Sequence, residues 1–383
     1  MTNAGKSGVF SFQELQTAIK DNVITSEVPI EGEQVQPASL DLRLGGKAYA
    51  LVSSFLPNQN QTIEDIIHVE DSYGADLVKY VVDISQGGVL DKGIIYLIPL
   101  MEGLNLPDGV DGKTNPKSTT GRLDIFSRVL SDKNPRFDHI KEGYKGQLYL
   151  EVMPRTFAVK LKQGQSLAQL RLRRGDSYIG DEELKNIYLD KKLLYTDTAV
   201  LPIDEAVISH GLFMSVDLKG VNGIVGYKAK KNSQVVDLTK RDFYKITDFW
   251  EPIEANKKGT LTLEEEEFYI LGSKEKIRIP NGYAADMAPF EAGSGELRTH
   301  YAGFFDPGFG YGNNGELSGT KAVLEVRAHD VPFMITDGQR FCKLYFEKMS
   351  EEPERLYGTE IGSSYQFQGI TLSKQFQKVV EKK

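Results

Sequence analysis

The stretch Ala-Ser-Leu-Asp-Leu at residues 38–42 returns as Met-Ser-Val-Asp-Leu at residues 214–218, a shift of 176 positions. The same shift relates Lys-Ser-Thr-Thr-Gly-Arg at residues 117–122 to Gly-Ser-Gly-Glu-Leu-Arg at residues 293–298. Two further matches follow in the same order with a shift of 174: Leu-Glu-Val at 150–152 and 324–326, and Gly-Gln at 164–165 and 338–339. Ordered matches with nearly constant spacing indicate two copies of one whole domain.

The repeat predicts a first domain over residues 1–200 and a second over residues 201–383, with the boundary near 195–205. A chain of 383 residues is long enough for two domains of roughly 100–200 residues each. Its 40% hydrophobic and 26% charged residues are typical of folded globular proteins.

The chain has 46 basic and 54 acidic residues, for a formal net charge of −8. This balance argues against an extended nucleic-acid-binding surface but not against local basic sites for small anions. The longest apolar run, near residues 94–100, is far shorter than the roughly 18 residues of a membrane span. Because the N-terminus also lacks the layout of a signal peptide, we expect a cytoplasmic protein with no membrane or nucleic-acid partner.

Cys342 is the only cysteine, so neither a disulfide within the chain nor a cysteine-rich zinc site can form. His68-Val-Glu70 has the His-x-Glu spacing of the zinc deaminases. Those enzymes also need a Pro-Cys-x-x-Cys sequence or an equivalent set of thiolates. A zinc-dependent site of that kind is therefore not expected.

Short apolar or alternating segments bounded by turn residues indicate a chain made mostly of strands. We expect strands at 48–51, 94–100, 147–152, 158–161, 167–172, 268–271, 322–327 and 341–346. Helices are expected at 12–20, where Ser11 and Glu14 have the spacing of a capping box, at 181–189 and at 239–246. These elements predict two mainly β domains, barrels or distorted jelly rolls, with a few peripheral helices.

Lys117, Ser118 and Arg122 lie on a glycine-containing turn that precedes an apolar segment. An amine, hydroxyls and a guanidinium on one turn supply hydrogen-bond donors suited to phosphate or carboxylate groups. The alternative interpretation is a solvated turn without a ligand. Ser294 and Arg298 occupy the equivalent positions of the second half.

Glu151 and Glu325 each stand inside an apolar strand segment. Alternation places Glu151 on the face opposite Leu150 and Val152, so it is either an outward-facing carboxylate or a group that lines a closed site. In a closed site, desolvation would make the glutamate a credible general base for a bound water.

Five motifs follow one another along the chain: Gln-Pro-Ala-Ser-Leu-Asp-Leu-Arg-Leu-Gly (36–45), Pro-Lys-Ser-Thr-Thr-Gly-Arg-Leu (116–123), Gly-Gln-Leu-Tyr-Leu-Glu (146–151), Ala-Gly-Phe-Phe-Asp-Pro-Gly-Phe (302–309) and Tyr-Gln-Phe-Gln-Gly-Ile-Thr-Leu-Ser (365–373). In this order they resemble the motifs of the dCTP deaminases, a family with the trimeric dUTPase-like fold. The resemblance implies two tandem dUTPase-like domains, as in the long bacterial form of the family.

The resemblance implies an enzyme of pyrimidine deoxynucleotide metabolism that converts dCTP and water to dUTP and ammonia without zinc. A glutamate activates the water, and Glu151 matches it most directly, with Glu325 as its counterpart. A serine and an arginine hold the water and support the developing charge; they match Ser118 and Arg122, with Ser294 and Arg298 as counterparts.

The resemblance also implies contacts with the nucleotide, which binds as its Mg²⁺ complex with the metal carried mainly by the triphosphate. The positions that match are Lys117, Asp138, Asp306, Phe309, Tyr365 and Gln368. The last two belong to a C-terminal tail that is expected to fold over bound nucleotide and exclude water.

Several departures from the family pattern leave open which copy works. Extra residues separate Asp138 from Gly143, the second half has glycine where Lys117 stands in the first, and 310–319 is a long insertion. One tail also serves two copies. Because the family's sites lie between subunits of a threefold ring, we expect a homotrimer.

Two other functions remain open at this stage. A bifunctional enzyme would also hydrolyse dUTP to dUMP, with Asp306 available to position the attacking water. A pure dUTP diphosphatase is disfavoured, because the tail lacks the Arg-Gly-x-x-Gly-Phe-Gly-Ser pattern. A non-catalytic nucleotide sensor with the same fold is the remaining alternative.

Overall fold

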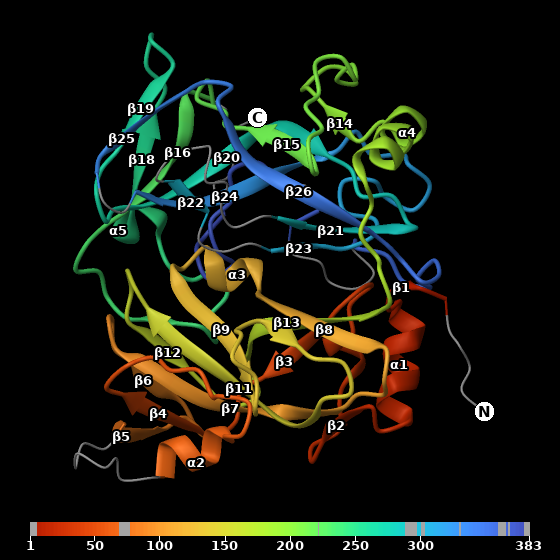
Figure 1. Ribbon diagram of the computed structural model, residues 1–383. Coiled ribbons are helices and arrows are strands. Elements are labelled where there is room, and N and C mark those ends of the chain that lie inside the picture. Colours follow the sequence, from red (N-terminus) through yellow and green to blue (C-terminus); the bar gives the residue numbers. More distant parts are fainter. Residues whose placement is uncertain are drawn as a thin grey trace. The chain divides into compact units, whose positions relative to one another are not determined.

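The computed structural model describes residues 6–68, 77–220, 222–287, 297–299, 303–328, 331–358, 365–366 and 368–378. The chain forms two compact units (Figure 1). The first comprises the chain up to Asp176 with Asn232–Arg241, and the second comprises Ser177–Lys231 with the chain from Asp242 onward. Both units are mainly β, with few helices in the described chain, and the predicted fold class is confirmed.

The strands of the first unit form sheets whose pairing is mostly antiparallel. They are β1 (Gly8–Val9), β2 (Ile24–Ser26), β3 (Leu40–Arg43), β4 (Lys47–Leu51), β5 (Val78–Asp83), β6 (Gly88–Leu90), β7 (Ile95–Asn105), β8 (Val110–Pro116), β9 (Ile125–Ser131), β10 (His139–Ile140), β11 (Lys145–Pro154), β12 (Val159–Leu161), β13 (Ser166–Arg174) and β17 (Val236–Asp237). The strand orders are β1-β13-β8-β10 with β3 also on β13, β5-β4-β7-β11-β9 with β2 also on β7, and β17-β12-β6.

A segment from much later in the sequence completes the first unit. β17 runs parallel to β12, with Val236 N–H donating to the Ala158 carbonyl (3.0 Å) and Leu238 N–H donating to the Lys160 carbonyl (2.8 Å). Val236 is fully buried, so the segment is held by packing as well as by hydrogen bonds.

Helices of the first unit are peripheral: α1 (Phe12–Lys20), the 3₁₀ turn η1 (Gly32–Gln34), α2 (Ile63–His68) and α3 (Ser118–Gly121). α1 has the predicted bounds and the predicted capping box. The Ser11 Oγ accepts from Glu14 N–H, and the Glu14 carboxylate accepts from Ser11 N–H (3.0 Å). Phe12, Leu15 and Ala18 form its buried face.

The second unit has sheets with the orders β18-β16-β20-β24-β22, with β14 also on β20, then β15-β26-β21-β23 and β19-β25. Their bounds are β14 (Leu194–Tyr195), β15 (Leu212–Ser215), β16 (Ile224–Ala229), β18 (Trp250–Glu254), β19 (Thr260–Leu263), β20 (Phe268–Ile277), β21 (Tyr283–Met287), β22 (Leu297–Thr299), β23 (Phe304–Phe305), β24 (Thr320–Ala328), β25 (Phe333–Thr336) and β26 (Arg340–Lys348). The strands predicted in both halves of the sequence are present.

The division between the units falls earlier in the chain than the expected boundary near residues 195–205. The reason is that α4 (Asp181–Lys191) and β14 both pack within the second unit. Leu184, Ile187 and Tyr188 of α4 belong to its core, and β14 pairs with β20. The predicted helix at 181–189 is thus confirmed.

The helix predicted at 239–246 is wrong. Asp242 has a left-handed backbone (φ 50°), and the chain from there runs beside the C-terminal tail. Asp242 N–H donates to the Lys374 carbonyl (2.9 Å), and Tyr244 N–H donates to the Gln375 carbonyl (3.0 Å). Only the short helix α5 (Ile246–Phe249) follows, because the preceding backbone groups are used in this pairing.

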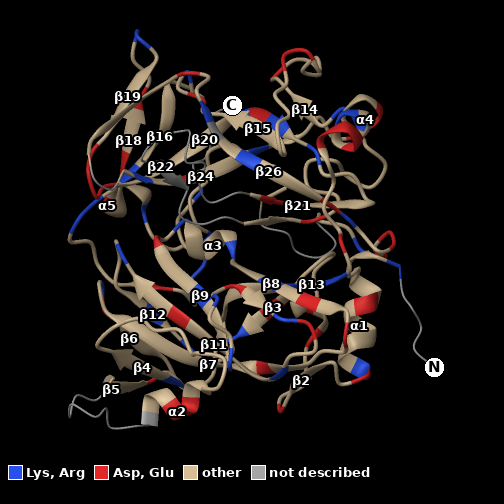
Figure 2. Cartoon of the chain, in the orientation of Figure 1, with Lys and Arg blue, Asp and Glu red and all other residues tan. Residues whose placement is uncertain are grey.

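Charged residues of both signs are interspersed along the elements of both units (Figure 2). None of the helices in the described ranges is long and apolar enough to span a membrane.

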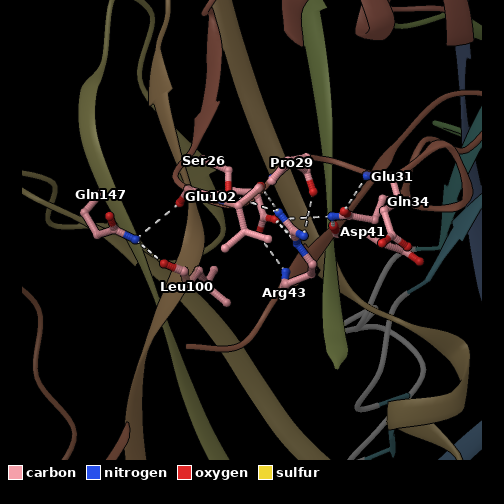
Figure 3. A network of polar contacts seen from close by, with 10 residues as sticks. Ser26, Pro29, Glu31, Gln34, Asp41, Arg43, Leu100, Glu102 and Gln147 are labelled. Atoms are coloured by element: carbon pink, nitrogen blue, oxygen red, sulfur yellow. Dashed lines mark hydrogen bonds and ion pairs between the residues drawn. The ribbon is translucent and has the colours of Figure 1, made fainter. Parts of the chain in front are cut away.

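A buried network fixes strand β3 in the first unit (Figure 3). Glu102 on β7 has no exposed surface and accepts from both the backbone N–H and the Nε of Arg43 (2.6 Å each). The Gln34 amide donates to the same carboxylate (3.2 Å) and to the Asp41 carbonyl (3.1 Å).

The remaining Arg43 N–H groups donate to the Pro29 and Val28 carbonyls and to the Ser26 hydroxyl. The position of β3, which carries Asp41, therefore depends on Glu102.

Replacing Glu102 by alanine is expected to lower the free energy of unfolding by about 3–5 kcal/mol, because Arg43 would stay buried without its counter-ion. Urea denaturation followed by circular dichroism measures the change. The control is Glu182→Ala on α4, where an exposed pair with Lys185 is lost, at a cost below about 1 kcal/mol. Equal stabilities of the two variants would contradict the structural role of Glu102.

Candidate active site

The Lys117–Arg122 turn is a single helical turn anchored on β13, not a solvated loop. Lys117 N–H donates to the Leu167 carbonyl (2.9 Å), and the Thr120 hydroxyl donates to the same carbonyl (2.8 Å). Within the turn, Arg122 N–H donates to the Ser118 carbonyl (3.0 Å), which closes α3. The turn leads through Asp124, which has φ 54°, into β9 (Figure 1).

The structure brings Ser118 and Arg122 together, as the sequence predicts. The Arg122 Nε donates to the Ser118 hydroxyl (3.0 Å), and only 2% of Arg122 is exposed. A guanidinium held in this way has its orientation fixed before any ligand binds, so its charge is preorganised.

Lys117 forms an ion pair with Asp41 of β3. One oxygen of the Asp41 carboxylate takes this amine, and its other oxygen, Oδ1, is buried without a hydrogen-bond partner within the described residues. The Lys117 side chain remains partly exposed. Asp41 therefore fixes the position of the Lys117 amine, which is the group predicted to bind an anion.

The second unit keeps the aspartate but takes its lysine from another element. Asp217 pairs with Lys321 of β24 (2.5 Å), and its other oxygen accepts from Lys219 and Gly220 N–H (3.0 Å each). Burial alone would raise the pKa of Asp217, but the ion pair and the backbone donors outweigh it, and the pKa is lowered. Lys321 thus replaces the lysine that the second Ser-x-x-x-Arg motif lacks.

Glu151 is buried, with 2% of its surface exposed, so the outward-facing alternative is wrong. It lies on β11 directly opposite Arg128 of β9. The Arg128 Nε and Nη2 both donate to Glu151 Oε1 (3.1 and 2.5 Å). Glu151 Oε2 is buried and has no hydrogen-bond partner within the described part of the chain. A buried, unpaired carboxylate oxygen is costly and suggests a group that serves a ligand or water.

Asp138 is used inside the first unit. It has φ 57°, and its Oδ1 accepts from Val129 N–H (2.8 Å) and from the Thr114 hydroxyl (2.9 Å). Burial raises the pKa of Asp138 to about 6, although both hydrogen bonds favour the ionised form. Asp138 thereby joins the strands β8 and β9 that flank α3.

The second copy of the motif is only partly described. Glu325 is buried on β24, opposite Ile270 of β20. Arg298 lies on β22 opposite Arg327, but its side chain and the whole of Ser294 lie outside the described residues.

Asp306 and Phe309 belong to one buried turn of the second unit. Phe309 N–H donates to the Asp306 carbonyl (3.1 Å). The Phe309 ring packs edge-on against Phe305 and Tyr357, with centroids 5.1 and 5.3 Å apart, as part of the core. Their predicted contacts with a nucleotide stay predictions.

The described part of the C-terminal tail is docked on the second unit. The Gln366 amide donates to the Gly308 carbonyl (3.0 Å) and accepts from Gly310 N–H (3.2 Å), and Gln368 donates to the Lys321 carbonyl (3.0 Å). Tyr365 is buried, and Phe376 packs against Tyr244, Phe249 and Trp250.

Comparison with known proteins decides the family. The sequence models of the N-terminal and C-terminal domains of 2'-deoxycytidine 5'-triphosphate deaminase match residues 6–176 and 180–376. The chain belongs to the 2'-deoxycytidine 5'-triphosphate deaminase family. It is similar to the crystal structure of this deaminase from Agrobacterium tumefaciens, with 41% identity and a TM-score of 0.83 over 91% of this chain and 100% of that one.

Shorter relatives of the deaminase family match less than half of the chain. The dUMP-forming dCTP deaminase of Methanopyrus kandleri is 27% identical over 173 residues, which are 43% of this chain and 81% of that protein. The dCTP deaminase of Haloarcula marismortui is 31% identical over 140 residues, 36% of this chain and 65% of that protein.

Sequence reasoning missed two residues beside the candidate base Glu151, namely Arg128, which binds it, and Phe137, which packs on Arg128. The Arg128 guanidinium lies 3.6 Å from the centre of the Phe137 ring and 4.8 Å from that of Phe126. Strand alternation places Arg128 and Phe126 on one face of β9, but only the register with β11 shows that this face carries Glu151.

The titration of Asp138 gives a testable dependence of stability on pH. Folding raises its pKa from 3.8 to about 6, so the native state binds more protons than the unfolded state in this interval. The stability that the protonated form contributes is therefore lost as pH rises from about 4 to about 6. Asp138→Asn keeps an acceptor oxygen and does not titrate.

The free energy of unfolding of D138N, relative to the wild type, is thus expected to rise across this interval and to stay constant at higher pH. Urea denaturation of both proteins at matched pH values measures the difference. A difference that does not vary with pH would contradict the burial of a titrating carboxyl at this position.

Proposed function

We propose that the chain hydrolyses dCTP to dUTP and ammonia, with Glu151 as general base and without zinc. The observation that carries the proposal is the state of Glu151. Its carboxylate is buried, Oε1 is held by Arg128, and Oε2 is free of hydrogen bonds within the described chain. An oxygen in that state is available to accept a proton from water, which is what a general base does.

In the proposed reaction, Glu151 Oε2 accepts a proton from water while the water oxygen bonds to C4 of cytosine. The same carboxyl group then passes protons toward the exocyclic amine, the C4–N bond breaks, and ammonia leaves. Water and dCTP thus give dUTP and ammonia, with the glutamate returned to its starting state. Ser118 and Arg122, which already contact one another, supply a hydroxyl to hold the water and a positive charge to stabilise the transition state.

The nucleotide is proposed to bind as its Mg²⁺ complex. The donors at the Lys117–Arg122 turn are an amine, hydroxyls and a guanidinium, which fit phosphate oxygens and not a metal ion. The metal would therefore be held by the triphosphate, whose charge it would partly neutralise. We propose that the enzyme acts in pyrimidine deoxynucleotide metabolism, because its product would be dUTP, and that it acts in the cytoplasm.

A second candidate function is the further hydrolysis of dUTP to dUMP. The relatives from Methanopyrus kandleri and Nanoarchaeum equitans, each 27% identical over 43% and 41% of this chain, are dUMP-forming dCTP deaminases. In this reaction water would attack phosphorus, and pyrophosphate would be released. Asp306, buried in its turn, is the residue proposed to position that water.

Incubation with dCTP, and separately with dUTP, in the presence of Mg²⁺ distinguishes these reactions. We expect dCTP to give dUTP with no pyrophosphate, resolved by chromatography. Formation of dUMP and pyrophosphate would support the bifunctional enzyme, and the absence of any turnover would support a nucleotide sensor.

Glu151→Gln is expected to lower kcat by about 10²–10⁴-fold, because the amide cannot accept the proton of water. Glu325→Gln, made in parallel, measures the contribution of the second copy. Glu182→Gln, at the surface of α4, serves as the control. Full activity in both the E151Q and E325Q proteins would show that neither glutamate is the base.

The assembly is proposed to be a homotrimer, because the family's sites lie between subunits of threefold rings. Sedimentation equilibrium under native conditions is expected to give three times the 42.8 kDa chain mass. A monomeric mass would contradict the proposal.

A further inference from the structure

Arg128 donates its hydrogen bonds to only one of the two carboxylate oxygens of Glu151. Nε and Nη2 both bind Oε1, and Nη2 also donates to the Ser54 hydroxyl (3.0 Å). Because both donors bind Oε1, the ion pair leaves the buried Oε2 without a hydrogen bond from Arg128. An arginine that saturated the carboxylate would instead take both oxygens in a fork-to-fork arrangement, as Arg173 does with the two oxygens of Asp111 (2.9 and 3.0 Å).

The guanidinium is itself held in place by aromatic rings. Its central carbon lies 3.6 Å from the Phe137 ring centre, within the range of a strong cation–π contact. Phe137 packs against an apolar cluster that includes Leu97, Leu130 and Tyr149. In the register of β7, β9 and β11, Leu97 and Arg128 are the direct neighbours of Glu151 on either side. The carboxylate thus lies beside an apolar cluster, where a misplaced charge would be costly.

We propose that Arg128 is the positioning residue for the general base, fixing Glu151 by Oε1 so that Oε2 alone meets the water. The proposal rests on the proposed function, since it concerns the residue assigned as the base there. Arg128 contributes no proton and acts only through Glu151.

The internal repeat offers a contrast. Six positions after Arg122 stands Arg128, whereas six positions after Arg298 stands Phe304, on β23 opposite Asp286. The second half has neither arginine nor lysine between Thr299 and Thr320. The sequence of the second half thus has no arginine at the position that corresponds, by this offset, to Arg128.

The test compares Arg128→Met and Arg128→Lys with a matched control, Arg174→Met. Arg174 is also partly exposed, pairs with a glutamate (Glu14, 3.2 Å) and lies over a phenylalanine ring (Phe10, 4.6 Å). We expect R128M to lower kcat for dCTP by about 10²-fold, the scale of a misplaced catalytic group, with KM unchanged. R128K keeps a charge but not the two donors, so it should recover only part of kcat. R174M should retain the wild-type kcat.

The double variant R128M/E151Q separates positioning from a general loss of structure. If Arg128 acts only through Glu151, then R128M will not lower the residual activity of E151Q any further. An additional loss in the double variant, a wild-type kcat in R128M, or a rise in KM alone would each overturn the inference.

Failure of the proposed function is recognised separately. A wild-type protein that does not release ammonia from dCTP, or an E151Q protein with full activity, would overturn the proposed function and the inference with it. An active wild type, an inactive E151Q and a fully active R128M would overturn the inference alone.

Discussion

A carboxylate buried between strands must be given a cation or several N–H donors, because an unpaired charge in a protein interior costs several kcal/mol. Four such carboxylates organise this chain, and each pairs with a cation distant in the sequence: Glu102 with Arg43, Asp41 with Lys117, Glu151 with Arg128, and Asp217 with Lys321. Each pair therefore fixes one element against another. The proposed catalytic residues are carried by elements that these pairs hold in place.

The four carboxylates differ in whether both of their oxygens have hydrogen-bond partners. Glu102 uses both oxygens, on Arg43 and Gln34, and Asp217 uses both, on Lys321 and two backbone donors. Asp41 and Glu151 each keep one buried oxygen without a partner within the described residues. An unsatisfied acceptor is retained only where something offsets its cost, and binding of water or substrate is such a gain. Both of these carboxylates lie in the first unit, and one of them, Glu151, is the proposed base.

The two copies also show how a domain can diverge while keeping its charge balance. Asp41 is matched by Asp217, yet the lysine that neutralises it comes from the Ser-x-x-x-Arg turn in the first copy and from β24 in the second. The amine beside the first turn is partly exposed, whereas the Lys321 side chain is almost fully buried. The ion pair of the second copy is therefore more deeply buried than that of the first. In both copies the buried aspartate keeps a lysine partner, and the lysine of the first copy, Lys117, is the one proposed to bind phosphate.

How much of this a sequence predicts depends on how far apart the partners lie. Ser118 and Arg122 are four positions apart on one helical turn, so their contact follows from local geometry, and the motif predicted that they cluster on one turn. The alternation of β11 predicted that Glu151 points away from Leu150, but which side chain it meets depends on the register between β9 and β11. A shift of one residue in that register would place Ser127 or Val129 opposite the glutamate and expose the Arg128 guanidinium to different neighbours.

The prediction of a helix at 239–246 was wrong for a similar reason. The backbone N–H groups of this segment donate to a tail that lies about 130 positions later, at Lys374 and Gln375. Long-range pairing, rather than local propensity, thus decides where the proposed base is held.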